Sequence, residues 1–179
     1  MSKVTWKPGT LLAPVPAVMV SCGTMEKPNI ITIAWTGIVN SDPAMTYISV
    51  RRERFSHALI SKSGEFVINL TTSALSRATD LCGVKSGRDT DKFALANLTP
   101  EPASKLSCPM IVQSPLSLEC KVTQVLPLGS HDMFLAKIIA VNVEESLLDE
   151  KGKLHLSRCG LLSYAHGEYF AQGRRLGGF

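Results

Sequence analysis

A two-residue alternation of apolar and polar side chains recurs along this chain, and it limits the fold more than any other feature of the sequence. The clearest example lies between residues 116 and 125, where the apolar positions are Leu116, Leu118, Cys120 and Val122. Successive side chains of a β-strand point to opposite faces. The alternation therefore predicts a strand with one buried face and one solvated face.

Further strands are predicted wherever short apolar runs are bounded by turn residues. These runs cover residues 17–22, 29–36, 45–50, 65–70, 133–143 and about 154–156. Helical patterns are fewer, at about 56–62, 74–82 and 92–95. The expected N-caps are Ser56, Ser73 and either Asp89 or Thr90, and Gly83 is the expected stop of the second helix. Many strands with frequent turns and few helices favour a closed, mainly β barrel over a doubly wound sheet.

Length and composition indicate one globular domain over residues 1–179. The net charge of +4 is small, and the basic residues are scattered except at Arg51, Arg52 and Arg54. That distribution, with 6% aromatic residues, does not favour a nucleic-acid surface. A local basic cluster suits a small anionic ligand instead.

The cysteines and the apolar runs indicate the compartment. Five cysteines without a C-x-x-C pair predict reduced, mostly buried thiols. The apolar run 11–20 is interrupted by Pro14 and Pro16, no signal-peptide cleavage site follows it, and no run approaches the ~18 apolar residues of a membrane helix. We therefore expect a cytoplasmic protein without a membrane partner.

Several enzyme classes lack their sequence signatures. The chain has no G-x-x-x-x-G-K-[ST] loop, no G-x-G-x-x-G fingerprint and no G-x-S-x-G elbow. Its four histidines and five cysteines lack zinc-ligand spacing, so no metal is expected.

Several short segments, taken in order, carry a family resemblance. They are NIITIAWT (29–36), SDP (41–43), SVR (49–51), GEFVIN (64–69), GRDTDKF (87–93), GSHD (129–132) and YAHGEYF (164–170). Together they resemble the flavin reductase-like, FMN-binding split-barrel family, and within it most of all the flavoredoxin group. The resemblance spans roughly residues 8–177. It implies a Greek-key split barrel, non-covalently bound FMN and a homodimer with the flavin near the subunit interface.

The residues of the 29–36 strand suit the flat ring of FMN. The ring needs backbone N–H groups along its polar edge and an apolar wall, which Thr32, Ala34, Trp35 and Thr36 could supply. The alternative is that Ile31, Ile33 and Trp35 simply belong to the core.

The phosphate of FMN requires Arg, hydroxyl and helix-start N–H groups. The candidates are Ser49, Arg51, Ser56 and His57, and Val50 between them is a further cofactor-binding candidate. For Arg51 the alternative is a salt bridge, and Arg52 and Arg54 are expected on the solvated surface.

The family resemblance adds Lys92, His131 and Tyr164 to the cofactor-binding residues. The pattern alone would make Lys92 a surface lysine and His131 a turn histidine. The resemblance places Lys92 at the phosphate or the ring edge, His131 near the flavin and Tyr164 against the ring. Lys92 and His131 are expected to act on the flavin rather than on folding, and no residue is predicted as a general acid or base.

Three functions are compatible with these features. The first is an NAD(P)H-dependent flavin reductase, in which NAD(P)H is a transient electron donor. The second is a flavoredoxin-like electron carrier reduced by a redox protein partner, and the third is a non-catalytic barrel that binds nucleic acid or another small ligand. A homodimer is expected from the resemblance, and the apolar N-terminal residues Trp6, Leu11 and Leu12 suit it.

Overall fold

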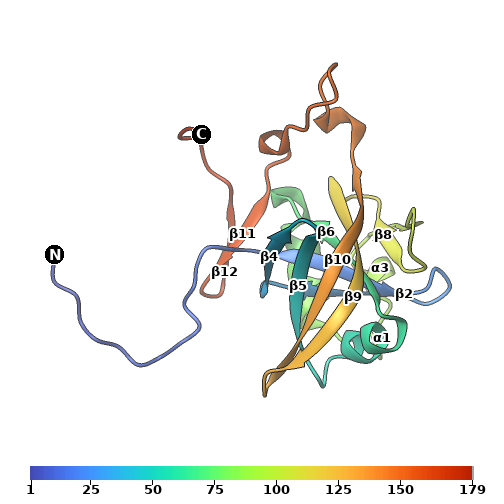
Figure 1. The fold of residues 1–179 in the computed structure, drawn as a ribbon, viewed down its shortest axis with the longest axis horizontal. Coiled ribbons are helices and arrows are strands. Elements are labelled where there is room, and N and C mark those ends of the chain that lie inside the picture. Colours follow the sequence, from blue (N-terminus) through green and yellow to red (C-terminus); the bar gives the residue numbers. More distant parts are fainter. Residues whose placement is uncertain (179) are drawn as a thin grey trace.

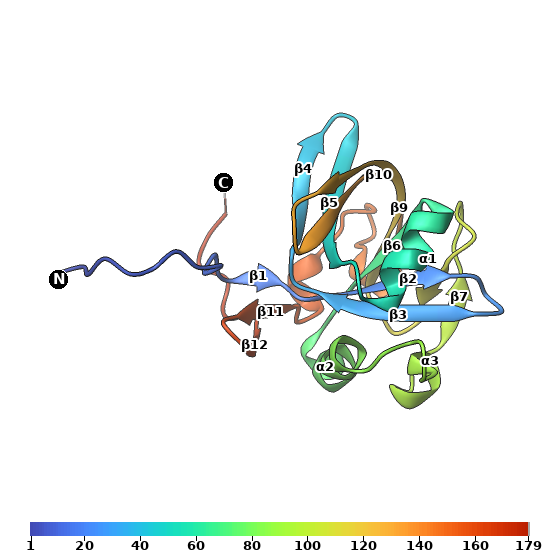
Figure 2. The same ribbon diagram turned by 90° about the horizontal axis from the view of Figure 1, so that it is seen from below.

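Seven strands form one strongly curved antiparallel sheet in the computed structural model, which describes residues 1–178 (Figure 1). Their order is β3 (Pro28–Ile33), β2 (Val18–Gly23), β6 (Glu65–Leu70), β9 (Leu116–Pro127), β10 (His131–Val143), β5 (Ala44–Arg51) and β4 (Thr36–Ser41). The edge strands β3 and β4 are consecutive in the chain and joined only by Ala34 and Trp35. Because so short a link must span the two edges, the sheet curves round into a barrel (Figure 2).

The predicted strand over 29–36 is wrong in one respect, because the chain turns a corner within it. It leaves β3 after Ile33 and enters β4 at Thr36. Thr36 is buried, and its hydroxyl donates a hydrogen bond to the carbonyl oxygen of Tyr47, 2.5 Å away. Apolar alternation continues through the corner, so the pattern alone cannot distinguish a straight strand from a bent one.

The two ends of the chain meet in a separate three-stranded sheet, called here the terminal sheet. It consists of β1 (Val15–Pro16), β11 (Leu162–Ala165) and β12 (Glu168–Ala171). A further pair, β7 (Pro100–Pro102) and β8 (Pro109–Ile111), lies beside the barrel. The strand expected near 154–156 is wrong: Leu154 makes only an isolated bridge, and a 3-10 turn, η3 (Leu156–Arg158), follows.

The helices are short, as predicted, and they cover the barrel. They are α1 (Phe55–Ser63), α2 (Ser76–Val84) and α3 (Lys92–Leu95), with 3-10 turns η1 (Ser73–Leu75) and η2 (Glu145–Leu147). Gly64 ends α1 at φ 68°, and its N–H donates to the carbonyl oxygen of Ile60 at 2.8 Å. Helices α2 and α3 lie against the outer side of β3 (Figure 2).

The predicted caps do not hold. Ser56 lies inside α1, Ser73 makes no side-chain cap, and α3 is capped by Asp91, whose carboxylate accepts the N–H of Ala94 at 3.1 Å. Gly83 is not a stop but lies within α2. A Cβ at Gly83 would approach the side chain of Thr32 to 3.3 Å, so the glycine allows α2 to pack closely on β3.

The apolar core has two layers that share the strands β2 and β3. The inner layer fills the barrel and includes Val20, Ile31, Ile48, Phe66 and Phe134. The outer layer lies under α2 and α3 and includes Met19, Ile30, Cys82 and Phe93. Strand β2 is therefore buried on both faces, which explains its continuous apolar sequence.

Residues 1–14 form an extended N-terminal arm that leaves the barrel (Figures 1 and 2). Four of the five cysteines are buried, which agrees with the prediction of mostly buried thiols. Within residues 1–178, no helix combines the length and the apolar character that crossing a membrane requires. In the same residues, no three His, Cys, Asp or Glu side chains are grouped so that they could hold a metal ion.

Candidate functional site

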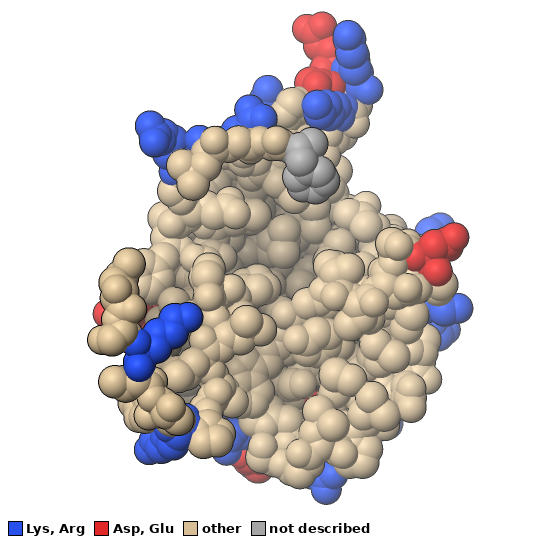
Figure 3. All heavy atoms as spheres, turned by 60° about the vertical axis from the view of Figure 1, so that its left-hand side comes forward, with Lys and Arg blue, Asp and Glu red and all other residues tan. Residues whose placement is uncertain are grey.

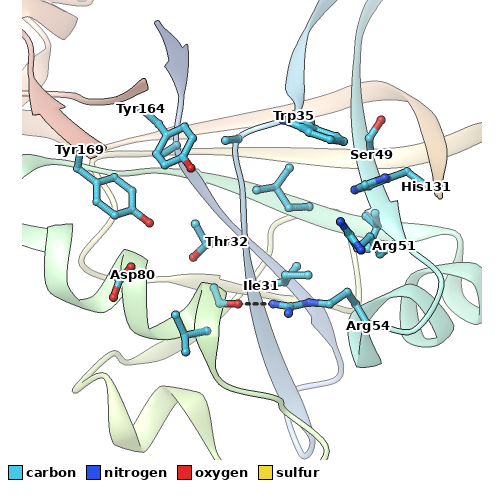
Figure 4. A pocket seen from close by; sticks show the side chains of 16 residues that line it. Ile31, Thr32, Trp35, Ser49, Arg51, Arg54, Asp80, His131, Tyr164 and Tyr169 are labelled. Atoms are coloured by element: carbon cyan, nitrogen blue, oxygen red, sulfur yellow. Dashed lines mark hydrogen bonds between the residues drawn. The ribbon is translucent and has the colours of Figure 1, made fainter. Parts of the chain in front are cut away.

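A cavity of about 330 Å³ lies where the β3–β4 corner, the end of β5, the start of β10, helix α2 and the terminal sheet meet (Figure 4). Most of the site residues predicted from the sequence line this ring cavity: Thr32, Ala34, Trp35, Ser49, Val50, Arg51, His131 and Tyr164. They come from four strands and one corner that are distant in the sequence. The fold therefore brings most of the predicted site together.

Trp35 projects from the corner instead of filling the core. Its side chain is 43% exposed, and its ring lies over His131 with centroids 4.4 Å apart and planes tilted by 40°. The carbonyl oxygen of Trp35 accepts the N–H of Ser49 at 2.9 Å, which holds the corner against β5. Ile31 and Ile33 are buried core residues that also border the cavity.

His131 is an uncharged ring at neutral pH. Burial lowers the pKa of His131 below its usual value, and the neighbouring Arg51 lowers it further against the opposing effect of Glu53. The Nδ1 atom lies 2.9 Å from the hydroxyl of Ser130. A neutral imidazole next to Trp35 can offer one hydrogen-bond donor or acceptor to a ligand without adding charge.

Arg51 stands opposite His131 in the β5–β10 ladder. Its guanidinium lies 3.5 Å from the carboxylate of Glu53, and its side chain is 58% exposed. Exposed ion pairs contribute little stability. The salt bridge considered from the sequence exists, yet it leaves Arg51 able to turn toward an anion at the cavity.

The terminal sheet closes the cavity with two tyrosines. Tyr164 on β11 pairs with Tyr169 on β12, and their rings meet edge to face at 5.5 Å. Burial and the nearby Asp80 raise the pKa of Tyr169. Sequence reasoning missed Tyr169, although the His166–Gly167 turn sets the two tyrosines opposite each other in a hairpin.

Four predicted site residues do not line the ring cavity. Thr36 bonds to β5 as described above, and Ser56 and Lys92 line a neighbouring cavity. His57 points to Asp132, whose carboxylate lies 2.9 Å from its Nε2 atom, and its ring packs edge-on against Phe134 at 5.2 Å.

The neighbouring cavity, called here the cationic cavity, measures about 240 Å³ and shares Ile31 and Arg54 with the ring cavity. Its other basic lining residues are Lys85, Arg88 and Lys92, and Glu53 is the one acid in the described lining. The expectation of a solvated Arg54 is wrong: it is half-buried, and its guanidinium donates to the carbonyl oxygen of Gly83 (Figure 4).

Lys92 has a structural role that the sequence pattern hides. It is only 3% exposed, and its Nζ donates to the carbonyl oxygens of Ile30 at 2.7 Å and Cys82 at 2.8 Å. Burial lowers the pKa of Lys92 to about 8. The expectation that Lys92 has no part in folding is therefore wrong, because it ties β3 to α2. Its contact with a flavin remains a prediction.

The loop at residues 85–88 forms a closely packed wall of the cationic cavity. A Cβ at Gly87 would overlap the side-chain oxygen of Asn29. The amide of Asn29 donates in turn to the hydroxyl of Ser56 at 2.7 Å. Glycine at position 87 is thus required for the loop to reach this place.

The family model described as the flavin reductase like domain matches residues 11–173 of this chain. The chain belongs to this family. Flavoredoxin of Desulfovibrio vulgaris (Miyazaki F) is 29% identical, with a TM-score of 0.91 over 99% of this chain and 97% of that one.

Two further solved structures are similar over 99% of this chain. Flavoredoxin from Methanosarcina acetivorans is 26% identical, with a TM-score of 0.91 over 95% of its own chain. The FMN-binding protein from Thermus thermophilus is 25% identical, with a TM-score of 0.82 over 98% of its chain. The family and the split-barrel fold that the sequence predicts are both confirmed.

Proposed function

We propose that this protein binds FMN non-covalently and transfers electrons through it. The observation that carries the proposal is the pair of adjoining cavities, one with aromatic and apolar walls and one whose charged lining residues are mostly cations. FMN has the matching shape, with a flat apolar ring at one end and a phosphate at the other. Family membership and the similarity to the FMN-binding protein from Thermus thermophilus support the same ligand.

The residues of the ring cavity would hold and shield the flavin ring. Trp35 and Tyr164 provide aromatic surface, and Ile31 and Ile33 provide an apolar floor. Bound FMN would supply the redox chemistry, since the cofactor carries the electrons and the protein orients it. No side chain of this chain is assigned a proton-transfer role.

We place the phosphate in the cationic cavity. The sequence assigns it to Arg51, Ser49 and Ser56, but these residues are divided between the two cavities. Arg54 lies between the cavities, and Arg88 and Lys92 lie beyond it. That surplus of positive charge suits a phosphate better than Arg51 alone, which already pairs with Glu53.

Arg88→Ala and Arg51→Ala form a matched pair that tests the placement. A charge-assisted hydrogen bond contributes roughly 1.5–3 kcal/mol. Arg88→Ala should therefore weaken FMN about tenfold to a hundredfold and leave riboflavin, which lacks the phosphate, nearly unchanged. Arg51→Ala should affect both flavins by a similar, smaller factor. The reverse result, with a phosphate-selective loss only in Arg51→Ala, would move the phosphate to Arg51.

The visible spectrum of the purified protein tests flavin binding itself. A flavin spectrum, with FMN identified after heat release, is expected. Protein that stays colourless after FMN is added would contradict the proposal and favour a barrel that binds another ligand or nucleic acid.

Within this function we propose an NAD(P)H-dependent flavin reductase, with a flavoredoxin-like carrier as the second candidate. The two flavoredoxin neighbours favour the carrier, while the family name favours the reductase. Anaerobic mixing with NADH or NADPH separates the two candidates. Bleaching of the flavin within seconds is the result expected of a reductase, and no bleaching over minutes would favour a carrier reduced by a redox protein partner.

We also propose that the protein is a homodimer. Trp6, Leu11 and Leu12 are exposed on the N-terminal arm. The face shown in Figure 3 is hollowed near its middle and carries Lys, Arg, Asp and Glu mainly at its rim. Light scattering at micromolar concentration should report a dimer, and deletion of residues 1–12 should shift it toward monomer. A monomeric full-length chain would refute the proposal.

A further inference from the structure

Asp132 is a buried carboxylate next to the ring cavity, and the flavin site proposed above does not use it. It lies near the start of β10, opposite Val50 of β5, and is 7% exposed. One carboxylate oxygen accepts Nε and Nη2 of Arg52 at 2.9 and 2.8 Å, and the other lies 2.9 Å from Nε2 of His57. The bond from Arg52 lowers the pKa of Asp132 most, burial opposes it, and His57 lowers it further, so the carboxylate is ionised at neutral pH.

These contacts hold the turn between β5 and α1. The turn is closed by a hydrogen bond from the N–H of Arg54 to the carbonyl oxygen of Arg51 at 3.1 Å. Arg51 and Arg54 line the cavities, whereas Arg52 between them bonds to Asp132. Asp132 therefore fixes the middle of the turn through Arg52.

The same carboxylate also fixes the first turn of α1. His57 belongs to that turn, and its ring packs against the fully buried Phe134. Arg51, Arg52 and Arg54 lie within four positions and repel one another, which disfavours a compact turn. The buried carboxylate of Asp132 offsets this repulsion, because it binds Arg52 and also His57 in the first turn of α1.

We propose that Asp132 is a positioning residue: by holding Arg52 and His57 it sets the Arg51–Arg54 turn so that Arg54, which lines both cavities, addresses the anionic part of the ligand. The inference rests on the proposed FMN function. Asp132 itself lines neither the ring cavity nor the cationic cavity. Its effect on ligand binding is therefore indirect.

Asp132→Asn removes the charge at nearly constant volume, and Asp149→Asn is the matched control. Asp149 makes the same kind of contact, with its carboxylate 2.8 Å from Nε2 of His155, but it lines neither cavity. Asp132→Asn should raise the Kd for FMN about tenfold and the Kd for riboflavin by less than about twofold. Asp149→Asn should change neither Kd.

A second measurement tests the turn without any flavin. Trypsin cleaves after arginine, and cleavage of a folded protein follows the population of locally opened states. Asp132→Asn should be cut after Arg51, Arg52 or Arg54 at least about five times faster than wild type under native conditions, and Asp149→Asn at the wild-type rate. If Asp132→Asn folds poorly, Arg52→Gln replaces it in both measurements, the flavin Kd values and the rate of trypsin cleavage, because the Arg52 side chain is largely exposed.

The outcomes separate this inference from the proposed function. Equal weakening of FMN and riboflavin, or an unchanged Kd for both, overturns the positioning role. If wild type binds neither flavin, the proposed function fails, and the cleavage comparison alone decides whether Asp132 holds the turn. Equal cleavage of wild type, Asp132→Asn and Arg52→Gln would then overturn the inference as well.

Discussion

The ring cavity has two walls that are attached to the molecule in different ways. The barrel wall comes from β3, β5 and β10, which belong to a seven-stranded sheet around a buried core. The tyrosine wall comes from β11 and β12. They join the barrel through the pairing of β11 with β1, the bridge from Thr72 to Leu161, and single bonds from Leu162 to Thr71 and from Ser73 to Gly160. The barrel wall can therefore hold a ligand in a fixed place, while the tyrosine wall can open locally at low cost.

The largest expected effect is on stability, when the same truncation is made in each region. Phe134 is fully buried in the barrel, and Phe170 of the terminal sheet is 46% exposed. Phe134→Ala should lower the free energy of unfolding by about 3–5 kcal/mol, and Phe170→Ala by less than about 1 kcal/mol. Urea unfolding measures both, and similar losses would show that the two regions unfold as one rigid unit.

The next effect is on affinity and tests whether the tyrosine wall belongs to the site. Tyr164→Ala should weaken FMN and riboflavin alike by about tenfold, because its ring faces the cavity and a stacked aromatic contributes up to about 1.5 kcal/mol. The melting temperature of the apo protein should stay within about 2 °C. Phe170→Ala is the control, and a loss of affinity there equal to that of Tyr164→Ala would point to general loosening of the hairpin.

A smaller effect is expected in the pH dependence of the stability of the barrel wall, to which Lys92 bonds through β3. The pKa of Lys92 is about 8 in the folded protein, against 10.5 for an unperturbed lysine. Between these values the unfolded chain binds more protons than the folded one, so stability rises with pH. Relative to Lys92→Met, wild type should gain on the order of 1 kcal/mol between pH 7.5 and pH 9.5, after allowance for solvent screening. Parallel pH curves for the two proteins would refute the low pKa.

The smallest effect is expected at His131, which lies on the barrel wall but points into the cavity. His131→Ala should weaken FMN by about threefold to fivefold, because one neutral hydrogen bond and the contact with Trp35 are lost. The apo melting temperature should hardly change, and it must be compared without ligand because bound flavin raises apparent stability. Normal FMN binding by this variant would make His131 an ordinary surface group.

Local patterns predict six of the seven barrel strands, because each of these six has a buried apolar face; they do not predict β4, which is mostly exposed. They also predict Arg51, which reaches the cavity from the end of a strand, whereas His131 is predicted only through the family resemblance. They fail where a contact depends on chain segments that meet only in the fold. Lys92 resembles a surface lysine until the carbonyl oxygens of Ile30 and Cys82 surround its Nζ. The β3–β4 corner was missed for a related reason, since nothing local marks where a strand changes edges.

The pairing of Val15 with Tyr164 has a consequence for how the protein is made. The ribosome releases β1 before any strand of the barrel sheet and β11 after all of them, so the tyrosine wall cannot assemble until residues 162–171 have emerged. A nascent chain that stops before residue 160 contains every strand of the barrel sheet but lacks one side of the ring cavity. Capture of the proposed flavin ring would therefore follow the synthesis of β11 and β12, after the barrel has had the chance to fold.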